Sequence, residues 1–384
     1  MRRVKTICAR LMVAMLLGST AMTASAQSYD FTQLDRLLRR AAANLPSGLE
    51  VAIVQNGHEI YRKRFGRWRQ DRQGAIASST KWLSGAVILS LVDDGTLSLD
   101  DKASQYLPYM TGEKASITIR QLMSHTAGFG GEFPLVNRCL GDPSTTLDLC
   151  AQALAATPLQ IPPGTGLLYS GAGMQVAGRV AEVASGKDWQ TLFRERIAIP
   201  LGLESTDYEY KGPTQNPRIS GGGRSTASDY MKFLRMIAGQ GLFEGRRVLS
   251  AQAVETMLKD QTRGVPIVES PFQRASQHDP NAASNRYGIG NWLEDLDQNG
   301  ETTWNSSPGV TGWTPFIDRS RDLQVVVATE SFRGFLPYYY PMKEILKNLI
   351  PQTGPAPVGQ SGGHAGQPPV DAPHPANHFQ GEQR

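Results

Sequence analysis

Residues 80–92 are apolar on nearly every face of the helix that they are expected to form. Such a helix must be buried on all sides, so the chain has to fold around it. Ser78 stands directly before this helix, and Lys81 follows three residues later. This spacing predicts that the hydroxyl and the amine lie one helical turn apart on the same side.

This pair has the chemistry of an activated nucleophile. Burial of Lys81 favours its neutral, basic form, and a base beside the Ser78 hydroxyl makes that oxygen nucleophilic. The backbone N–H groups of a helix N-terminus also suit a developing oxyanion. Two other interpretations stay open at this point, because Ser-x-x-Lys is a short pattern. Ser78 is also a good N-cap, and Lys81 has a stem that can lie along apolar surface.

The first 26 residues have the pattern of a cleavable signal peptide. A basic segment, an apolar core at 11–17 and Ala-Ser-Ala at 24–26 predict cleavage after Ala26 and export to the periplasm or the medium. The apolar core is too short to span a membrane. The leader holds four of the 39 Lys and Arg and none of the 35 Asp and Glu, so the charges of the mature chain balance. Bulk charge therefore gives no indication of a nucleic-acid partner.

Two cysteines remain after the leader, Cys139 and Cys150. In an oxidising compartment we expect them to form a disulfide, with a pair of free buried thiols as the alternative. Residues 351–384 are rich in Pro, Gly, Gln and His and poor in apolar residues, so we expect a disordered tail.

Residues 27–350 are expected to form one α+β domain. Its α/β part would comprise about 27–92 and 285–350, with an antiparallel sheet built from both ends of the chain, and about 93–284 would be an inserted helical part. The residue patterns predict helices over 31–43, 117–128, 146–155, 175–184, 189–196, 228–239 and 341–349. They predict strands over 49–54, 60–65, 287–293, 312–317 and 323–329, and a long surface loop over 259–286.

From about residue 34 to 349 the chain resembles the penicillin-binding-protein and class C β-lactamase superfamily, and within it the family VIII serine esterases. The resemblance rests on several blocks in the right order. They are Ser78-Ser79-Thr80-Lys81 with Asp94-Gly95-Thr96-Leu97, residues 119–128, Pro163-Gly164 with Tyr169-Ser170-Gly171, residues 200–203 and residues 221–230.

The resemblance implies that Ser78 is acylated, with Lys81 as its partner. Tyr169 matches the tyrosine of the Tyr-x-Asn motif. It would take the proton from Ser78 and return it to the leaving group. A core tyrosine with a bonded hydroxyl is the alternative for Tyr169. His125 is expected to be structural, because the chain holds no Gly-x-Ser-x-Gly elbow for a Ser-His-Asp triad.

Two motif positions differ from the family pattern. Gly171 stands where the family has asparagine, and Ser307-Pro308-Gly309 stands where it has Lys-Thr-Gly or His-x-Gly. The site would therefore lack a side-chain amide that holds the substrate and a cation that binds the carboxylate of the substrate. Gly309 and the Val310 N–H would still form an oxyanion hole with the Ser78 N–H. Ser307 and Gly171 are placed among the substrate contacts by position alone.

The sequence thus predicts an exported serine hydrolase that acts through an acyl-enzyme on a small ester or amide. It would need neither a metal nor an organic cofactor. Two alternatives stay open: a β-lactamase or D-alanyl-D-alanine carboxypeptidase acting on cell-wall peptides, and a protein of the penicillin-recognising fold that binds without turnover. The acyl specificity and the oligomeric state do not follow from the sequence.

Overall fold

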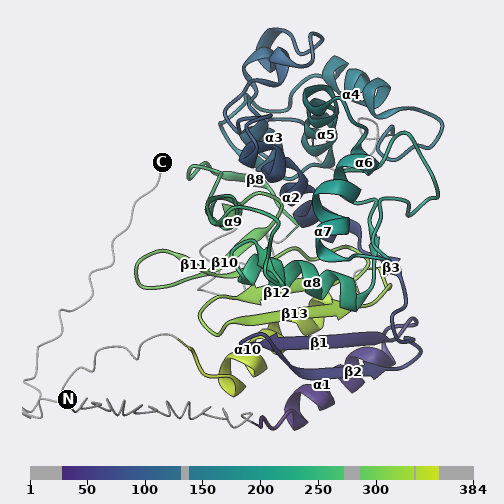
Figure 1. Ribbon diagram of the computed structural model, residues 1–384, viewed down its shortest axis with the longest axis vertical. Helices are drawn as coiled ribbons and strands as arrows, with labels where there is room; N and C mark the ends of the chain where they lie inside the picture. Colours follow the sequence, from purple (N-terminus) through teal and green to yellow (C-terminus); the bar gives the residue numbers. More distant parts are fainter. Residues whose placement is uncertain (1–27, 131–137, 272–285, 333, 354–384) are drawn as a thin grey trace, which may run out of the picture.

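The computed structural model describes residues 28–130, 138–271, 286–332 and 334–353 (Figure 1). The predicted leader and nearly all of the predicted tail lie outside the described residues. Within these ranges the chain forms a central antiparallel sheet and a group of helices at one side of it (Figure 1). The predicted α+β class is confirmed. Of the described helices, none is long and apolar enough to cross a membrane.

The main sheet is built from both ends of the chain. Its strand order is β2-β1-β13-β12-β11-β10-β9, and every neighbouring pair is antiparallel. The β1–β2 hairpin turns at Asn56 and Gly57, both with positive φ, as the Asn-Gly pair favours. The strands are β1 (Leu49–Gln55), β2 (His58–Phe65), β9 (Arg286–Tyr287), β10 (Trp292–Leu296), β11 (Thr302–Ser306), β12 (Thr314–Asp318) and β13 (Leu323–Ala328).

The two faces of this sheet are covered by different parts of the chain. Helices α1 (Thr32–Ala43) and α10 (Leu336–Leu349) pack against each other and share a core with alternate residues of β1 and β13. Helix α8 (Ala227–Ala238) contacts β1, β12 and β13 and belongs to the larger core cluster (Figure 1). Alternation along the strands thus divides the apolar interior into two layers.

Helix α2 (Thr80–Asp93) connects the sheet to the helical part. It is buried from Thr80 to Leu91, as its continuous apolar sequence predicts. Helices α5 (Gly171–Ser185), α6 (Trp189–Phe193) and α9 (Ala251–Leu258) pack against it. The remaining α-helices are α3 (Ile119–Met123), α4 (Leu147–Ala156) and α7 (Ile199–Leu201).

Short elements join these larger ones. Three small sheets pair β3 (Gly74–Ala75) with β5 (Arg224–Ser225), β4 (Leu167–Leu168) with β8 (Ile267–Glu269), and β6 (Leu242–Phe243) with β7 (Arg246–Arg247). Single turns of helix lie at η1 (Ala77–Ser79), η2 (Ala103–Gln105), η3 (Gly112–Ser116) and η4 (Arg194–Ala198).

Several predicted elements differ from the structure. The single strand expected over 287–293 is instead divided into the antiparallel strands β9 and β10 by a turn at 288–291. The helix expected over 117–128 is limited to α3, because the backbone of His125 adopts a φ of +61° just beyond it. The helix expected over 189–196 continues through the π-helical turn η4 to Leu201. The surface loop expected over 259–286 contains the strand β8, and its residues 272–285 lie outside the described residues.

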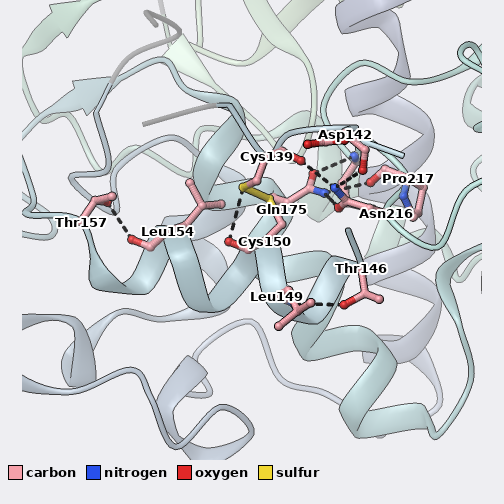
Figure 2. Close-up of a disulfide and its surroundings, with 11 residues drawn as sticks. Cys139, Asp142, Thr146, Leu149, Cys150, Leu154, Thr157, Gln175, Asn216 and Pro217 are labelled. Atoms are coloured by element: carbon pink, nitrogen blue, oxygen red, sulfur yellow. Dashed lines mark hydrogen bonds between the residues drawn. A yellow bond between two sulfur atoms is a disulfide. The ribbon is translucent and has the colours of Figure 1, made fainter. Parts of the chain in front are cut away.

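The predicted disulfide is present. Cys139, in the loop before α4, is bonded to Cys150 within α4 (Figure 2). The carbonyl of Cys139 accepts a hydrogen bond of 2.6 Å from the Asn216 amide, whose oxygen accepts one of 2.9 Å from Gln175 of α5. The disulfide loop is thereby joined to the loop that contains Asn216.

Candidate active site

Ser78 lies in a tight turn between β3 and α2. The turn begins at Ala77, whose φ of +43° is unusual for a residue with a side chain, so its surroundings must hold it in place. Two hydrogen bonds fix the turn: the Tyr230 hydroxyl donates to the Ser79 carbonyl at 2.7 Å, and the Ser79 hydroxyl donates to the Ser307 carbonyl at 2.6 Å. Ser78 is half-buried, whereas the residues that follow it are buried. Its hydroxyl is therefore accessible on a rigid support.

Lys81 lies beside this hydroxyl. Its Nζ donates to Ser78 Oγ at 3.1 Å and to the Ser220 carbonyl at 2.8 Å, and the residue is 1 % exposed. The two residues thus face each other across one turn at the start of α2, as their spacing predicts. The distance is that of a hydrogen bond through which a proton can pass.

Tyr169 follows β4, immediately before α5. Its ring lies 4.7 Å from Lys81 Nζ and stacks on Trp292 of β10, with 5.2 Å between the ring centroids. The backbone N–H of Tyr169 donates to the Glu269 carbonyl of β8 at 3.0 Å. The structure therefore brings Ser78, Lys81 and Tyr169 together from separate segments of the chain.

His125 packs behind Tyr169. Its ring contacts those of Tyr169 and Tyr287, with centroid distances of 4.4 and 4.6 Å. Its Nδ1 accepts a hydrogen bond of 3.3 Å from the Ser170 N–H. Burial, and secondly the charge of Lys81, lower the pKa of His125 well below its usual value. A neutral ring in these contacts supports the tyrosine, which agrees with a structural role.

The turn after β11 packs against the turn of Ser78. A side chain at Gly309 would bring its Cβ within 2.3 Å of the Ile76 carbonyl and 3.2 Å of Ala77, so only glycine fits. The N–H of Gly309 donates to the Trp313 carbonyl at 2.7 Å. This corrects one expectation. Gly309 allows its turn to lie close to the turn of Ser78, and its N–H is bonded to Trp313 rather than directed at an oxyanion. Val310, the next residue, is 44 % exposed at this turn.

Ser307 is a buried support of the same turn. Its hydroxyl donates to the Ser78 carbonyl at 3.3 Å and to the Gly290 carbonyl at 3.1 Å, and the residue is 2 % exposed. Its placement among the substrate contacts is therefore corrected. The side chain binds the backbone on both sides and holds the nucleophile turn on the sheet.

Gly171 lies where an added side chain would strike two neighbouring side chains. An added Cβ would come within 2.5 Å of Ser220 Oγ and 3.1 Å of Leu140. The Ser220 hydroxyl therefore lies in the space that a side chain at this position would enter. Gly171 itself starts α5, which is capped by the Ser170 side chain.

Sequence reasoning missed three residues of this site. Trp292 and Tyr287 fall in a predicted strand, and nothing in their sequence distinguishes them from ordinary core residues. Ser220 directly precedes the glycine run 221–223 of the resemblance, but its contact with Lys81 spans an irregular loop. Among the described residues, no group of three or more His, Cys, Asp or Glu side chains is arranged to hold a metal ion.

The sheet, the helical insertion and the Ser78–Lys81 pair define a protein of the penicillin-binding-protein and β-lactamase fold class, a class of serine hydrolases. The Beta-lactamase family model matches residues 34–337. The chain belongs to that family.

The chain is similar to proteins with different activities. Penicillin-binding protein 4 of Amycolatopsis lactamdurans is 31 % identical over 56 % of this chain and 66 % of its own length. Lovastatin esterase of Penicillium rubens is 27 % identical over 73 % of this chain and 87 % of its own length. A candidate β-lactamase of Bacteroides dorei, known from its crystal structure, is 32 % identical with a TM-score of 0.74, over 84 % of this chain and 99 % of that one. This chain covers slightly less than two thirds of the length of penicillin-binding protein 4.

Proposed function

We propose that this protein is an exported serine hydrolase that cleaves uncharged esters through an acyl-enzyme on Ser78. One observation carries the proposal: the buried amine of Lys81 lies 3.1 Å from Ser78 Oγ at the start of α2. Because burial disfavours the ammonium, the amine is suited to accept the proton of the hydroxyl.

The reaction would begin with the attack of Ser78 Oγ on the carbonyl carbon of the ester. As the new C–O bond forms, the hydroxyl proton passes to Lys81, and the carbonyl electrons move to its oxygen. The N–H groups of Ser78 and Val310 would stabilise this oxyanion. When the carbonyl re-forms, the alcohol leaves and receives the proton through Tyr169. Water then attacks the acyl-enzyme by the same steps and releases the acid.

The altered motifs support a neutral substrate. Ser307 stands at the position of the family's cation, and its hydroxyl is bonded to two backbone carbonyls. A substrate carboxylate would thus lack the charged partner that this motif position otherwise supplies. Val310 adds exposed apolar surface at the turn that packs against Ala77. The similarity to lovastatin esterase supports the same substrate class, whereas the similarity to penicillin-binding protein 4 supports the cell-wall alternative.

Export is supported by the disulfide and by the leader. The Cys139–Cys150 bond suits an oxidising compartment, since such bonds rarely persist in the cytosol. Residues 1–26 have the sequence of a signal peptide, with cleavage after Ala26. The periplasm or the medium is the proposed location.

The test is a comparison of substrates on the purified mature chain. We expect turnover of p-nitrophenyl acetate and butyrate, with much weaker hydrolysis of nitrocefin and of a D-alanyl-D-alanine peptide. S78A should lose activity about a thousandfold or more, and a fluorophosphonate should label the wild type but not this variant. The matched control is S90A. The buried Ser90 hydroxyl donates to the Val87 carbonyl in the same helix, away from the site.

Each other outcome has a definite meaning. Nitrocefin or peptide hydrolysis that rivals the esters would replace the ester proposal by the cell-wall alternative. A wild type that neither turns over nor becomes labelled would favour the binding protein without turnover. Full activity of S78A would reject Ser78 as the nucleophile.

A further inference from the structure

The loop that contains Ser220 is fixed from two sides. The Ser84 hydroxyl of α2 donates to the Ile219 carbonyl at 2.7 Å, and the Ile219 N–H donates to Gln175 of α5 at 3.1 Å. Gln175 also donates to the Pro217 carbonyl at 3.0 Å (Figure 2). Ser220 is therefore held in place between two helices, and its own carbonyl accepts the 2.8 Å hydrogen bond from Lys81.

The Ser220 hydroxyl is buried and has no hydrogen-bond partner among the described residues. A buried hydroxyl without a partner costs free energy, so native proteins seldom retain one without a use. This one belongs to the residue that binds the Lys81 amine. It is also the atom that an added side chain at Gly171 would strike, at 2.5 Å.

We propose that Ser220 is the positioning residue of Lys81 and that it replaces the side-chain amide lost at Gly171. Glycine at 171 leaves the space, and it is occupied by the hydroxyl of the residue whose carbonyl binds the amine. When Lys81 accepts the proton of Ser78, the ammonium has one more N–H than the neutral amine. A rotation about the Cα–Cβ bond of Ser220 offers its oxygen as an acceptor to the charged form. No covalent bond changes at Ser220.

This proposal rests on the proposed function, because it gives Lys81 the role of proton acceptor. Its consequences differ from those of a merely structural serine. Loss of the hydroxyl would remove a hydrogen bond to a charged group in the transition state, and should lower kcat about tenfold with little change in KM. It would also destabilise the ammonium of Lys81 relative to the neutral amine. The acidic limb of the pH–rate profile should therefore move to lower pH.

The experiment measures kcat, KM and the pH–rate profile for p-nitrophenyl butyrate in wild type, S220A and S90A. S90A, which also removes a buried serine hydroxyl, should match the wild type. A second arm measures Tm for G171A and G171A/S220A. The single variant should be less stable than the wild type, and the double variant should regain most of the loss because the struck atom is gone.

The results separate the two proposals. An active wild type in which S220A keeps the kcat and pH profile of S90A would overturn the role of Ser220 and leave the ester proposal intact. A G171A/S220A variant no more stable than G171A would overturn the replacement of the amide. A wild type that hydrolyses no ester would overturn the proposed function, and the role of Ser220 with it.

Discussion

The Nζ atom of Lys81 lies over the ring of Tyr169, 4.7 Å from its centroid. The same ring stacks on Trp292 and contacts the His125 ring, with 4.4 Å between the centroids. Tyr169 therefore has two separable properties: an aromatic ring that packs the site and a phenol that can exchange a proton. Substitutions can remove the second while keeping the first.

The first prediction concerns the Y169F variant. Because the ring and its stack on Trp292 are kept, Tm should stay within a few degrees of the wild type. If the phenol returns the proton to the leaving alcohol, kcat for an alkyl ester such as ethyl butyrate should fall about a hundredfold or more. Y169A, which loses the stack as well, should also lower Tm. Retention of more than half of the activity in Y169F would leave Lys81 alone as the proton carrier.

The second prediction concerns the pH dependence of stability. Burial and the charge of Lys81 lower the pKa of His125, so the folded protein keeps this ring neutral where the unfolded chain binds a proton. Unfolding therefore takes up a proton at acidic pH. The contribution of His125 to the free energy of unfolding is fully present above about pH 6.5 and falls by about 1.4 kcal/mol per pH unit below it.

Asparagine is a suitable replacement at 125, because it tolerates the φ of +61° better than most residues. Urea unfolding at pH 7, 6 and 5 should show a steeper loss of stability in the wild type than in H125N. The same substitution at the exposed His58 of β2 should leave the slope as it is. Equal slopes in wild type and H125N would mean that the folded protein protonates His125 readily.

The sequence was sufficient where a pattern is local. The Asn-Gly turn, the buried helix α2 and the pairing of Cys139 with Cys150 each follow from a few neighbouring residues. Ser78 and Lys81 are close for the same reason, since helical spacing alone places them one turn apart.

Strand β11 and the first turn of α5 were missed, because interior polar groups and glycines conceal them. Strand β11 carries Asn305 in the core, where it donates to Asn291 at 2.9 Å, so it has no apolar alternation to detect. Helix α5 begins with glycines that lower helix propensity, although Ser170 caps it. The contact between Gly171 and Ser220 joins a helix to an irregular loop 49 residues away, which no periodicity can reveal.

The third prediction concerns the disulfide. Replacing both cysteines in C139S/C150S should lower the free energy of unfolding by about 3 kcal/mol, since the bond closes a short loop. The carbonyl of Cys139 also binds Asn216, which belongs to the loop that contains Ser220. We therefore expect kcat to fall as well, even well below Tm. Two free thiols per chain in the native, non-reduced protein would contradict the premise.

The fourth prediction concerns a buried ion cluster on the face of the sheet covered by α10. Lys343 donates to Glu294 at 3.0 Å and to Asp295 at 2.8 Å, and lies over the Trp304 ring. Its side chain is 2 % exposed. K343M keeps the volume but leaves the carboxylates without this partner. The free energy of unfolding should fall by about 3–5 kcal/mol at pH 7.

Acid should reduce this difference. Burial opposes the ionisation of Asp295, but Lys343 and Lys347 outweigh it, so its pKa lies below the usual value. The stability it contributes is present at neutral pH and is lost as the pH falls through the folded pKa. Without Lys343 the carboxyl accepts a proton more readily, which relieves the uncompensated charge in K343M. The difference in the free energy of unfolding between wild type and K343M should therefore narrow between pH 7 and 4.

The control is K347A, at a more exposed partner of Asp295. This variant should lower the free energy of unfolding by only about 1 kcal/mol. A gap between wild type and K343M that stays constant or widens on acidification would contradict this effect of Lys343 on Asp295.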